Sequence, residues 1–287
     1  MTSDVAWIVG GSIFFPSVFL VVRKCSFSLF SKSKNDVEAS CAAIALRCTS
    51  IIQALLAIVV GINIIRETYQ DVLFSRCLLV DIYCSFGVPY MIYDIGAMYI
   101  VHREEKKLND APTRKAIASF LNKQWVLVSH HLVLAAVFYP FVMLLRNGKG
   151  DFFVGCFFLA ELSTPAINIR TILIKLDMGD TLLYRVNSIT YLVSFFFCRV
   201  LLFPFLYWAY ANNKGLSIYD TFSTMRAICH VGCAALLAMQ IMWFYKFLKV
   251  VLRERKVRDS SPSKQIGNGM QDNNLTAPSV RSIGKAD

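Results

Sequence analysis

Cys41–Ile65 reads CAAIALRCTSIIQALLAIVVGINII, and Arg47 is the one charged side chain in this stretch. An apolar helix needs roughly 17 to 25 residues to cross the hydrocarbon layer of a bilayer, because each residue advances the helix by about 1.5 Å. The stretch therefore predicts a membrane-spanning helix, and the rest of the chain repeats the pattern.

Seven such stretches follow one another, and they predict an all-α protein, a polytopic membrane bundle of about seven transmembrane helices. The expected spans are Val5–Val22, Cys41–Ile65, Cys77–Val101, Trp125–Leu145, Phe152–Ile174, Val186–Ala211 and Met225–Val251. Pro16, Pro89, Pro140, Pro165 and Pro204 fall inside them. We expect kinks there, without helix ends, because neighbouring side chains can satisfy the freed backbone carbonyls.

The composition excludes a soluble enzyme. Of the 287 residues, 56% are hydrophobic and 17% charged, and the mean hydropathy is +0.51, outside the range of ordinary globular proteins. The nine cysteines form no C-x-x-C pair and most lie in apolar runs, so they predict small core side chains and no metal site. We expect no nucleic-acid partner.

The distribution of basic residues predicts the orientation in the membrane. Sixteen Lys and Arg fall in the segments 23–40, 102–124, 175–185 and 253–258, whereas five fall in 66–76, 146–150 and 212–224. Cytoplasmic loops carry the excess of Lys and Arg in membrane proteins. The first set is therefore expected in the cytosol, with the amino terminus in the lumen and the carboxyl terminus cytosolic.

The chain divides into three expected regions. Residues 1–40 comprise the first transmembrane helix and a basic cytosolic loop, and residues 41–252 form a six-helix membrane domain. Residues 253–287 begin with basic side chains and continue with Ser, Asn, Gly and Pro, which predicts a disordered cytosolic tail.

Several ionisable side chains fall inside the spans. Each costs about 2.5 to 3.5 kcal/mol to insert, so each needs a partner, a cavity or a function. Counting from the expected cytosolic ends, Asp94 lies about 10 Å into the bilayer, and the adjacent His130 and His131 lie about 8 to 9 Å in. The same layer contains, at about 6 to 9 Å, Arg47, Asn168 and Arg170.

A second, deeper layer contains Glu161 and Arg199. Both fall near the midplane, roughly 14 to 18 Å from the non-cytosolic side. This arrangement predicts an interhelical ion pair, which would act as a structural clamp or take part in substrate binding or proton relay.

The adjacent histidines are the most distinctive feature. Neighbouring residues on a helix point about 100° apart, so one imidazole faces the bundle while the other leans toward an adjoining helix. A neutral imidazole suits proton transfer or nucleophilic attack near neutral pH, although two histidines could also serve as hydrogen-bonded packing contacts. Asp94 could orient one of the histidines, or it could pair with Arg47.

These residues and the runs around them resemble the TLC-domain family, named for TRAM, Lag and CLN proteins, and within it the subgroup of TLC domain-containing protein three. The resemblance covers roughly residues 5–250. It is carried by Tyr93-Asp94, His130-His131, Gly150–Gly155, Ala160–Pro165, Asn168-Ile-Arg170 and Cys198–Pro204.

The resemblance implies a lipid-accessible cavity within the bundle, residence in the endoplasmic reticulum or Golgi membrane, and a role in sphingolipid or membrane-lipid metabolism. The best-understood relatives are ceramide synthases, whose essential histidine dyad corresponds to His130 and His131. Their motif also has two aspartates ahead of a glutamate. Counting back from Glu161, those positions hold Val154 and Phe157.

The leading hypothesis is an N-acyltransferase similar to ceramide synthases, which joins the acyl group of acyl-CoA to a sphingoid-base amine. One histidine would activate the amine or accept the acyl group, the other would set its tautomer with Asp94, and Asn168 would donate to the oxyanion. The expected substrate-binding residues are Tyr93, Asn168, Arg170, Glu161 and Arg199.

Two alternatives remain open because the two aspartates are missing. The protein could be a non-catalytic lipid-sensing protein, or a lipid transporter or scramblase gated by its buried acid–base pair. Acyl-CoA is expected as a co-substrate and no other cofactor, and the other expected partners are membrane lipids and a second copy of the chain.

Overall fold

The computed structural model describes residues 2–30 and 37–259, and all of its regular elements in these ranges are helices. This confirms the all-α prediction. The elements are, in chain order, α1 (Thr2–Phe30), α2 (Val37–Thr68), α3 (Leu78–Glu105), α4 (Thr113–Val133), η1 (Leu134–Phe138), η2 (Phe141–Leu145), α5 (Asp151–Leu159), η3 (Ala160–Ser163), α6 (Thr164–Lys175), α7 (Leu182–Phe195), η4 (Phe196–Val200), α8 (Leu202–Lys214), α9 (Ile218–Thr224) and α10 (Ala227–Asp259).

Within the described residues, seven continuous helical stretches are long and apolar enough to cross a membrane, which confirms the seven predicted spans. Several helix ends extend beyond the expected spans, and three of them do so by eight residues or more. Helix α1 continues past Val22 to Phe30. The fourth stretch begins at Thr113 instead of near Trp125, because a charged amphipathic segment continues the helix in the amino-terminal direction. The last helix continues to Asp259 through part of the expected tail. Residues 260–287 of that tail, and 31–36 of the first basic loop, lie outside the described residues.

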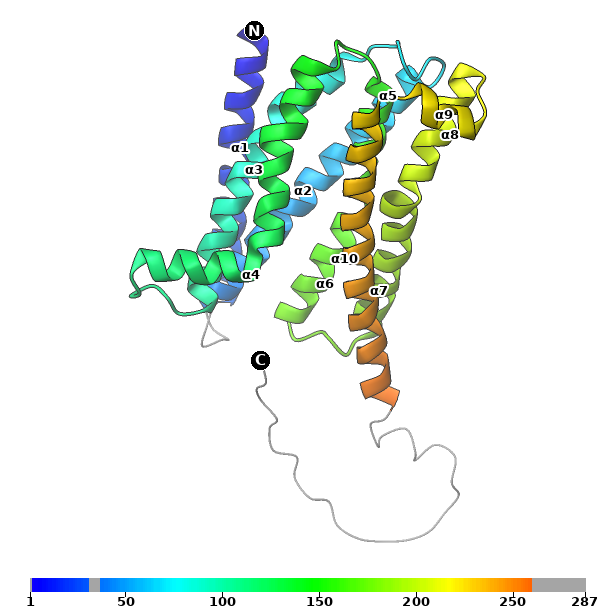
Figure 1. The fold of residues 1–287 in the computed structure, drawn as a ribbon. Helices are drawn as coiled ribbons and strands as arrows, with labels where there is room; N and C mark the ends of the chain where they lie inside the picture. The colour runs from blue at the N-terminus through cyan, green and yellow to red at the C-terminus, as the bar shows by residue number, and fades with distance from the viewer. Residues whose placement is uncertain (1, 31–36, 260–287) are drawn as a thin grey trace, which may run out of the picture. The chain divides into compact units, whose positions relative to one another are not determined.

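Helix α2 is the central helix of the bundle and packs against α1, α3, α5 and α6. The helices alternate in direction, so the loops gather at two ends (Figure 1). We call the end with loops 106–112 and 176–181 the basic end. The opposite end contains loops 69–77 and 146–150 together with α9.

Glycines allow the closest helix crossings. A Cβ added to Gly61 of α2 would lie 2.8 Å from the carbonyl oxygen of Gly155 in α5, and a Cβ on Gly155 would lie 2.9 Å from Ile64. A Cβ on Gly11 of α1 would overlap the carbonyl oxygen of Phe86 in α3. Small residues let membrane helices approach closely enough for their backbones to touch, and these contacts fix α1 and α5 on the central helices.

Three of the five expected proline kinks coincide with departures from α-helical geometry. Pro140 separates the two π-helical turns η1 and η2, Pro165 follows the 3₁₀ turn η3, and Pro204 follows the π-helical turn η4. Pro16 and Pro89 lie inside the continuous helices α1 and α3. A proline in the first turn of a helix removes no intrahelical hydrogen bond. This explains why α6 begins next to Pro165 and α8 begins near Pro204.

Ion pairs join the loops at the opposite end of the bundle. The fully buried carboxylate of Asp151 accepts a hydrogen bond of 2.7 Å from the backbone N–H of Cys77 and contacts the guanidinium groups of Arg76 and Arg146. Arg76 also lies 2.8 Å from Asp81. These contacts tie the start of α3 to the start of α5.

The chain divides into two units at Lys246, which lies within α10. Within the first unit, α10 is held by ring contacts. Phe244 packs against Phe195 and Phe196 at 6.0 and 5.8 Å, and His230 accepts or donates a hydrogen bond of 2.7 Å with the hydroxyl of Tyr207.

We predict that Gly61→Ala destabilises the protein by about 1 to 3 kcal/mol, because the added methyl group meets the backbone of α5, which cannot move aside. The matched control is Gly96→Ala in α3, where nothing lies within 4 Å of the added Cβ. Alanine improves helix propensity at both positions, so the difference between the two variants isolates the crossing. The measurement is the thermal unfolding midpoint in detergent, and equal midpoints for the two variants would contradict the close α2–α5 packing.

Candidate functional site

Asp94 of α3 and His131 of α4 meet in the interior of the bundle. Their side chains belong to residues that are 6% and 7% exposed, and His131 Nε2 lies 3.5 Å from Asp94 Oδ2. The other two polar atoms, His131 Nδ1 and Asp94 Oδ1, are buried and have no hydrogen-bond partner among the described residues. The pair therefore has one nitrogen and one oxygen available for a further contact.

Arg47 of α2 interacts with the same carboxylate. It interacts electrostatically with Asp94, while its Nη1 donates to Asn168 Oδ1 at 3.4 Å. Its buried Nε has no hydrogen-bond partner within the described ranges. Asn168 of α6 uses both amide hydrogens inside the protein, donating to Ser50 Oγ at 3.0 Å and to the carbonyl of Thr164 at 2.9 Å.

The predicted ion pair between Glu161 and Arg199 is present, with Arg199 Nη2 3.6 Å from Glu161 Oε2. Arg199 also donates to Ser163 Oγ and to Thr164 Oγ1, both at 2.9 Å. Thr164 in turn donates to Glu161 Oε2 at 2.5 Å. Glu161 lies on η3 and Arg199 on η4, so both partners of the pair stand on turns that depart from α-helical geometry ahead of a proline.

The two polar layers expected from the sequence are joined. Thr164 binds Arg199 and Glu161 through its hydroxyl group and Asn168 through its carbonyl, and Asn168 continues to Arg47. We call the connected set the polar cluster. Its members are Arg47, Ser50, Asp94, His131, Glu161, Ser163, Thr164, Asn168 and Arg199. It draws residues from five of the seven spans.

The two histidines face different neighbours, as the 100° rotation between adjacent residues requires. The His131 ring lies 6.3 Å from the ring of Tyr90, beside Asp94. The half-buried His130 ring packs edge-on against Trp243 of α10 at 5.2 Å. His131 is thus the member of the dyad that contacts the acid, and His130 is the member that contacts α10.

Two predicted site residues make ring contacts outside the polar cluster. The ring of Tyr93 packs against Phe19 of α1 at 6.2 Å, in the apolar cluster between α1, α2 and α3. The guanidinium group of Arg170 lies over the ring of Tyr184 in α7 at 4.9 Å. Their expected part in substrate binding remains a prediction.

The positions of the two missing aspartates are filled by apolar packing. Val154 is 5% exposed and lies in a cluster with Ile64, Val80 and Val142. The ring of Phe157 lies 6.0 Å from Phe138. A carboxylate at either position would be surrounded by apolar side chains, so the local packing agrees with the loss of both acids.

Helix α3 continues past Val101, the residue expected to end the third span. It passes through the polar residues His102 to Glu105 and ends eleven residues after Asp94. Because these polar residues belong outside the hydrocarbon layer, the depth of about 10 Å expected for Asp94 stays a prediction.

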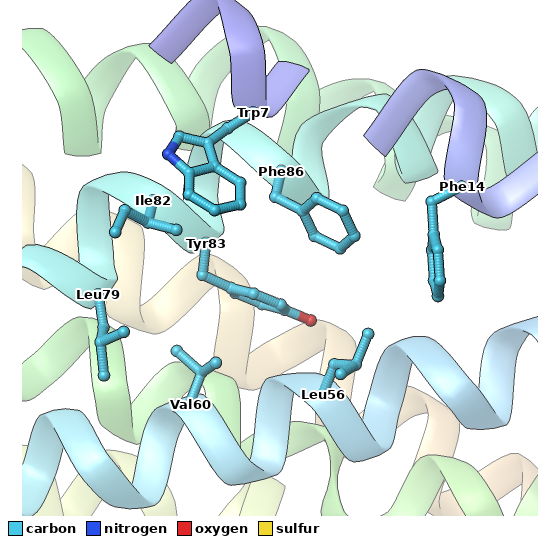
Figure 2. Close-up of a pocket in the computed structure, with 8 residues that line it drawn as sticks. All are labelled: Trp7, Phe14, Leu56, Val60, Leu79, Ile82, Tyr83 and Phe86. Carbon is cyan, nitrogen blue, oxygen red and sulfur yellow. The ribbon is translucent and has the colours of Figure 1, made fainter. Parts of the chain in front are cut away.

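A pocket of about 260 Å³ lies apart from the polar cluster, between α1, α2 and α3. Figure 2 shows the rings of Trp7, Tyr83 and Phe86 facing Leu56 and Val60 across it. The hydroxyl of Tyr83 donates to the backbone carbonyl of Gln53 at 3.1 Å, so this polar group is already bonded within the protein. A cavity at the polar cluster itself remains a prediction.

Sequence reasoning missed the hydroxyl groups that connect the polar cluster. Ser50, Ser163 and Thr164 were not expected as members, because serine and threonine are frequent in membrane helices and usually bond to the carbonyl one turn earlier. The signal that could have found two of them is their position beside Glu161 and ahead of Pro165, where the helix is interrupted.

These features define a multi-pass helical membrane protein with a polar cluster buried among its spans. A family model described as the TLC domain matches residues 44–249, and the chain belongs to the TLC-domain family. The match begins in α2, so α1 lies outside the family region.

One curated relative is TLC domain-containing protein 4-B of Xenopus laevis, which is 28% identical over 145 residues. The aligned part covers 50% of this chain and 54% of the relative, so the chain spans about half the length of the curated relative it matches. No solved structure matches the chain.

We predict that Arg199→Gln destabilises the protein by about 3 kcal/mol, because it leaves the Glu161 carboxylate uncompensated among the spans. The double variant Glu161→Gln/Arg199→Gln should recover at least half of that loss. Arg23→Gln is the control. It breaks the pair with Glu104, in which the Arg23 side chain is 31% exposed, and should cost less than about 1 kcal/mol. The measurement is the unfolding midpoint, and strictly additive effects of the two substitutions would contradict a coupled pair.

Proposed function

We propose that the protein acts on membrane lipids and that it transfers the acyl group of acyl-CoA to the amine of a sphingoid base. The observation that carries this proposal is the His131–Asp94 contact, in which one imidazole nitrogen lies against a carboxylate and the other has no partner among the described residues. A base oriented by a carboxylate is the arrangement that general-base catalysis of acyl transfer uses. Membership of the TLC-domain family supports the lipid class of the substrate.

In this mechanism, Asp94 accepts a hydrogen bond from His131 Nε2–H, so the free Nδ1 acts as the base. The amine nitrogen attacks the thioester carbonyl carbon while its proton passes to His131 Nδ1. The carbon–nitrogen bond forms, the carbon–sulfur bond breaks, and the CoA thiolate leaves with the proton of the imidazolium. Asp94 stabilises the transient imidazolium through its negative charge, and His131 returns to its neutral form.

The oxyanion that develops in this reaction needs a hydrogen-bond donor that has no partner inside the protein. Both amide hydrogens of Asn168 are bonded inside the protein, so the role expected for Asn168 falls more naturally to Arg47. The Nε–H of Arg47 is buried and has no partner in the described part of the chain, and a charged donor stabilises a developing oxyanion strongly.

A second candidate function is lipid sensing without catalysis. The observation that favours it is the apolar packing around Val154 and Phe157, which replaces the two acids of the ceramide synthase motif. In that case Asp94, His131 and Arg47 would hold a lipid headgroup through the same three available atoms without breaking a bond in it.

We further propose residence in the endoplasmic reticulum or Golgi membrane, with the basic end in the cytosol. The excess of Lys and Arg in the segments 23–40 and 102–124 supports this orientation. Acyl-CoA is a cytosolic donor, so its thioester would approach the polar cluster from the basic end.

The test of the reaction uses purified protein in nanodiscs with labelled acyl-CoA and a sphingoid base. We expect amide product from the wild type, and a loss of roughly 100-fold or more in His131→Ala and Asp94→Asn, because a general base contributes about that much. His230→Ala at the opposite end is the control and should keep the wild-type rate. The rate of amide formation by His130→Ala, compared with the wild-type rate, shows whether the contact of His130 with Trp243 matters for turnover.

Two results would overturn the acyltransferase proposal. If the wild type forms no amide with any long-chain amine but binds the sphingoid base saturably, the protein is a lipid-sensing protein. If amide forms and persists in both histidine variants, the mechanism through His131 is wrong.

The orientation has its own test. A glycosylation acceptor site placed ahead of Thr2 should be modified when the chain is translated with microsomes, whereas one placed in loop 106–112 should not. Modification of the loop site alone would reverse the proposed topology.

A further inference from the structure

The first part of α4 lies across the basic end of the bundle, and the later part runs along the bundle (Figure 1). We call residues 113–125 the α4 ledge. It precedes the apolar part of the fourth span and continues directly into the turns that carry His130 and His131.

The inner side of the ledge is anchored to the end of α3. Ala116 and Phe120 are 0% and 3% exposed, and the Phe120 ring packs against Tyr99 and His102 at 5.6 and 5.8 Å. His102 Nε2 also lies 3.0 Å from the hydroxyl of Ser119. The ledge is therefore held in a fixed orientation by buried contacts.

The outer side of the ledge carries an apolar stripe that the protein leaves uncovered. Ile117, Leu121 and Trp125 follow one another at intervals of four residues, so they share one face of the helix. They are 42%, 42% and 62% exposed. A helix with such a stripe lies in the plane of a membrane interface with the stripe in the acyl boundary, and tryptophan is enriched at that depth.

Positive charges are exposed on the same segment as the stripe. Arg114, Lys115 and Lys123 are exposed on the ledge, and Lys106 is exposed in the loop before it. Nearby carboxylates at the end of α3 are engaged by cations from other helices, Glu104 by Arg23 at 2.7 Å and Glu105 by Lys175 at 2.6 Å. Asp110 is the remaining acid of this loop, so the surface keeps a clear positive excess.

We propose that the α4 ledge is a binding site for anionic phospholipids of the bilayer. The phosphates of adjacent lipids would contact Arg114, Lys115 and Lys123, which are spread along the ledge, while their acyl chains would cover Ile117, Leu121 and Trp125. The uncovered stripe beside the charges is the reason to favour a bilayer lipid over a soluble phosphate compound, because a soluble anion would leave the apolar side chains exposed. The site does not depend on the proposed acyltransferase reaction.

The test uses the full chain with Trp7, Trp208 and Trp243 replaced by Phe, so that Trp125 is the only fluorophore of its kind. The protein is reconstituted in nanodiscs of phosphatidylcholine that contain about one tenth brominated phosphatidylserine or, in parallel, one tenth brominated phosphatidylcholine. We expect quenching of Trp125 by the brominated phosphatidylserine to exceed quenching by the brominated phosphatidylcholine at least threefold, and high salt to reduce the difference.

Arg114→Gln/Lys115→Gln/Lys123→Gln should abolish the preference for phosphatidylserine. The matched control neutralises three exposed cations of the opposite end, Arg66→Gln/Lys149→Gln/Lys214→Gln, and should keep the preference. Ile117→Ser/Leu121→Ser should lower quenching by both lipids, because it withdraws the stripe from the acyl boundary. Size-exclusion profiles verify that each variant is folded.

Three outcomes would overturn the proposal. Equal quenching of the wild type by both brominated lipids would show no preference for negative charge. An equal loss of preference in the control triple variant would show a general charge effect. Complete displacement of the brominated phosphatidylserine by added CoA would identify a soluble phosphate compound as the ligand.

Discussion

Apolar helices in a bilayer gain little from touching each other, because lipid tails surround an apolar side chain about as well as a neighbouring helix does. A buried polar group is different, since it must find its partner inside the protein. In this chain one such requirement is met by the ion pair between Glu161 and Arg199, which the hydroxyl groups of Ser163 and Thr164 complete. Through Asn168 the same network reaches α2, the central helix.

This constraint also positions the candidate site. Arg47 stands between Asn168 and Asp94, so the ion pair near the middle of the bundle is linked to the His131–Asp94 contact. The atoms left available at that contact come from α2, α3 and α4, and the last of these helices begins with the α4 ledge. His131 and the α4 ledge therefore lie on one continuous helix, which joins the proposed base to the proposed lipid-binding segment.

Several parts of this arrangement could be predicted from the amino-acid sequence. The number of spans follows from the length of the apolar runs, and the cost of inserting charge singled out Asp94, His131, Glu161 and Arg199. The ledge was missed because a search for apolar runs starts at Trp125, after the basic residues that make the segment interfacial. The partners Ser163 and Thr164 were missed because a neutral hydroxyl group does not carry the free-energy cost that marks a charged side chain in a membrane span.

The sequence by itself determined how many times the chain crosses the membrane, which loops share an end, and which polar side chains are embedded, because each of these depends on local hydrophobicity and length. Only the tertiary structure decided that Asp94 contacts His131, that the two polar layers join through Thr164, and that Tyr93 and Arg170 contact the rings of Phe19 and Tyr184. The physical reason is that a membrane helix is apolar nearly all round, so its sequence does not show which face it presents to which neighbour.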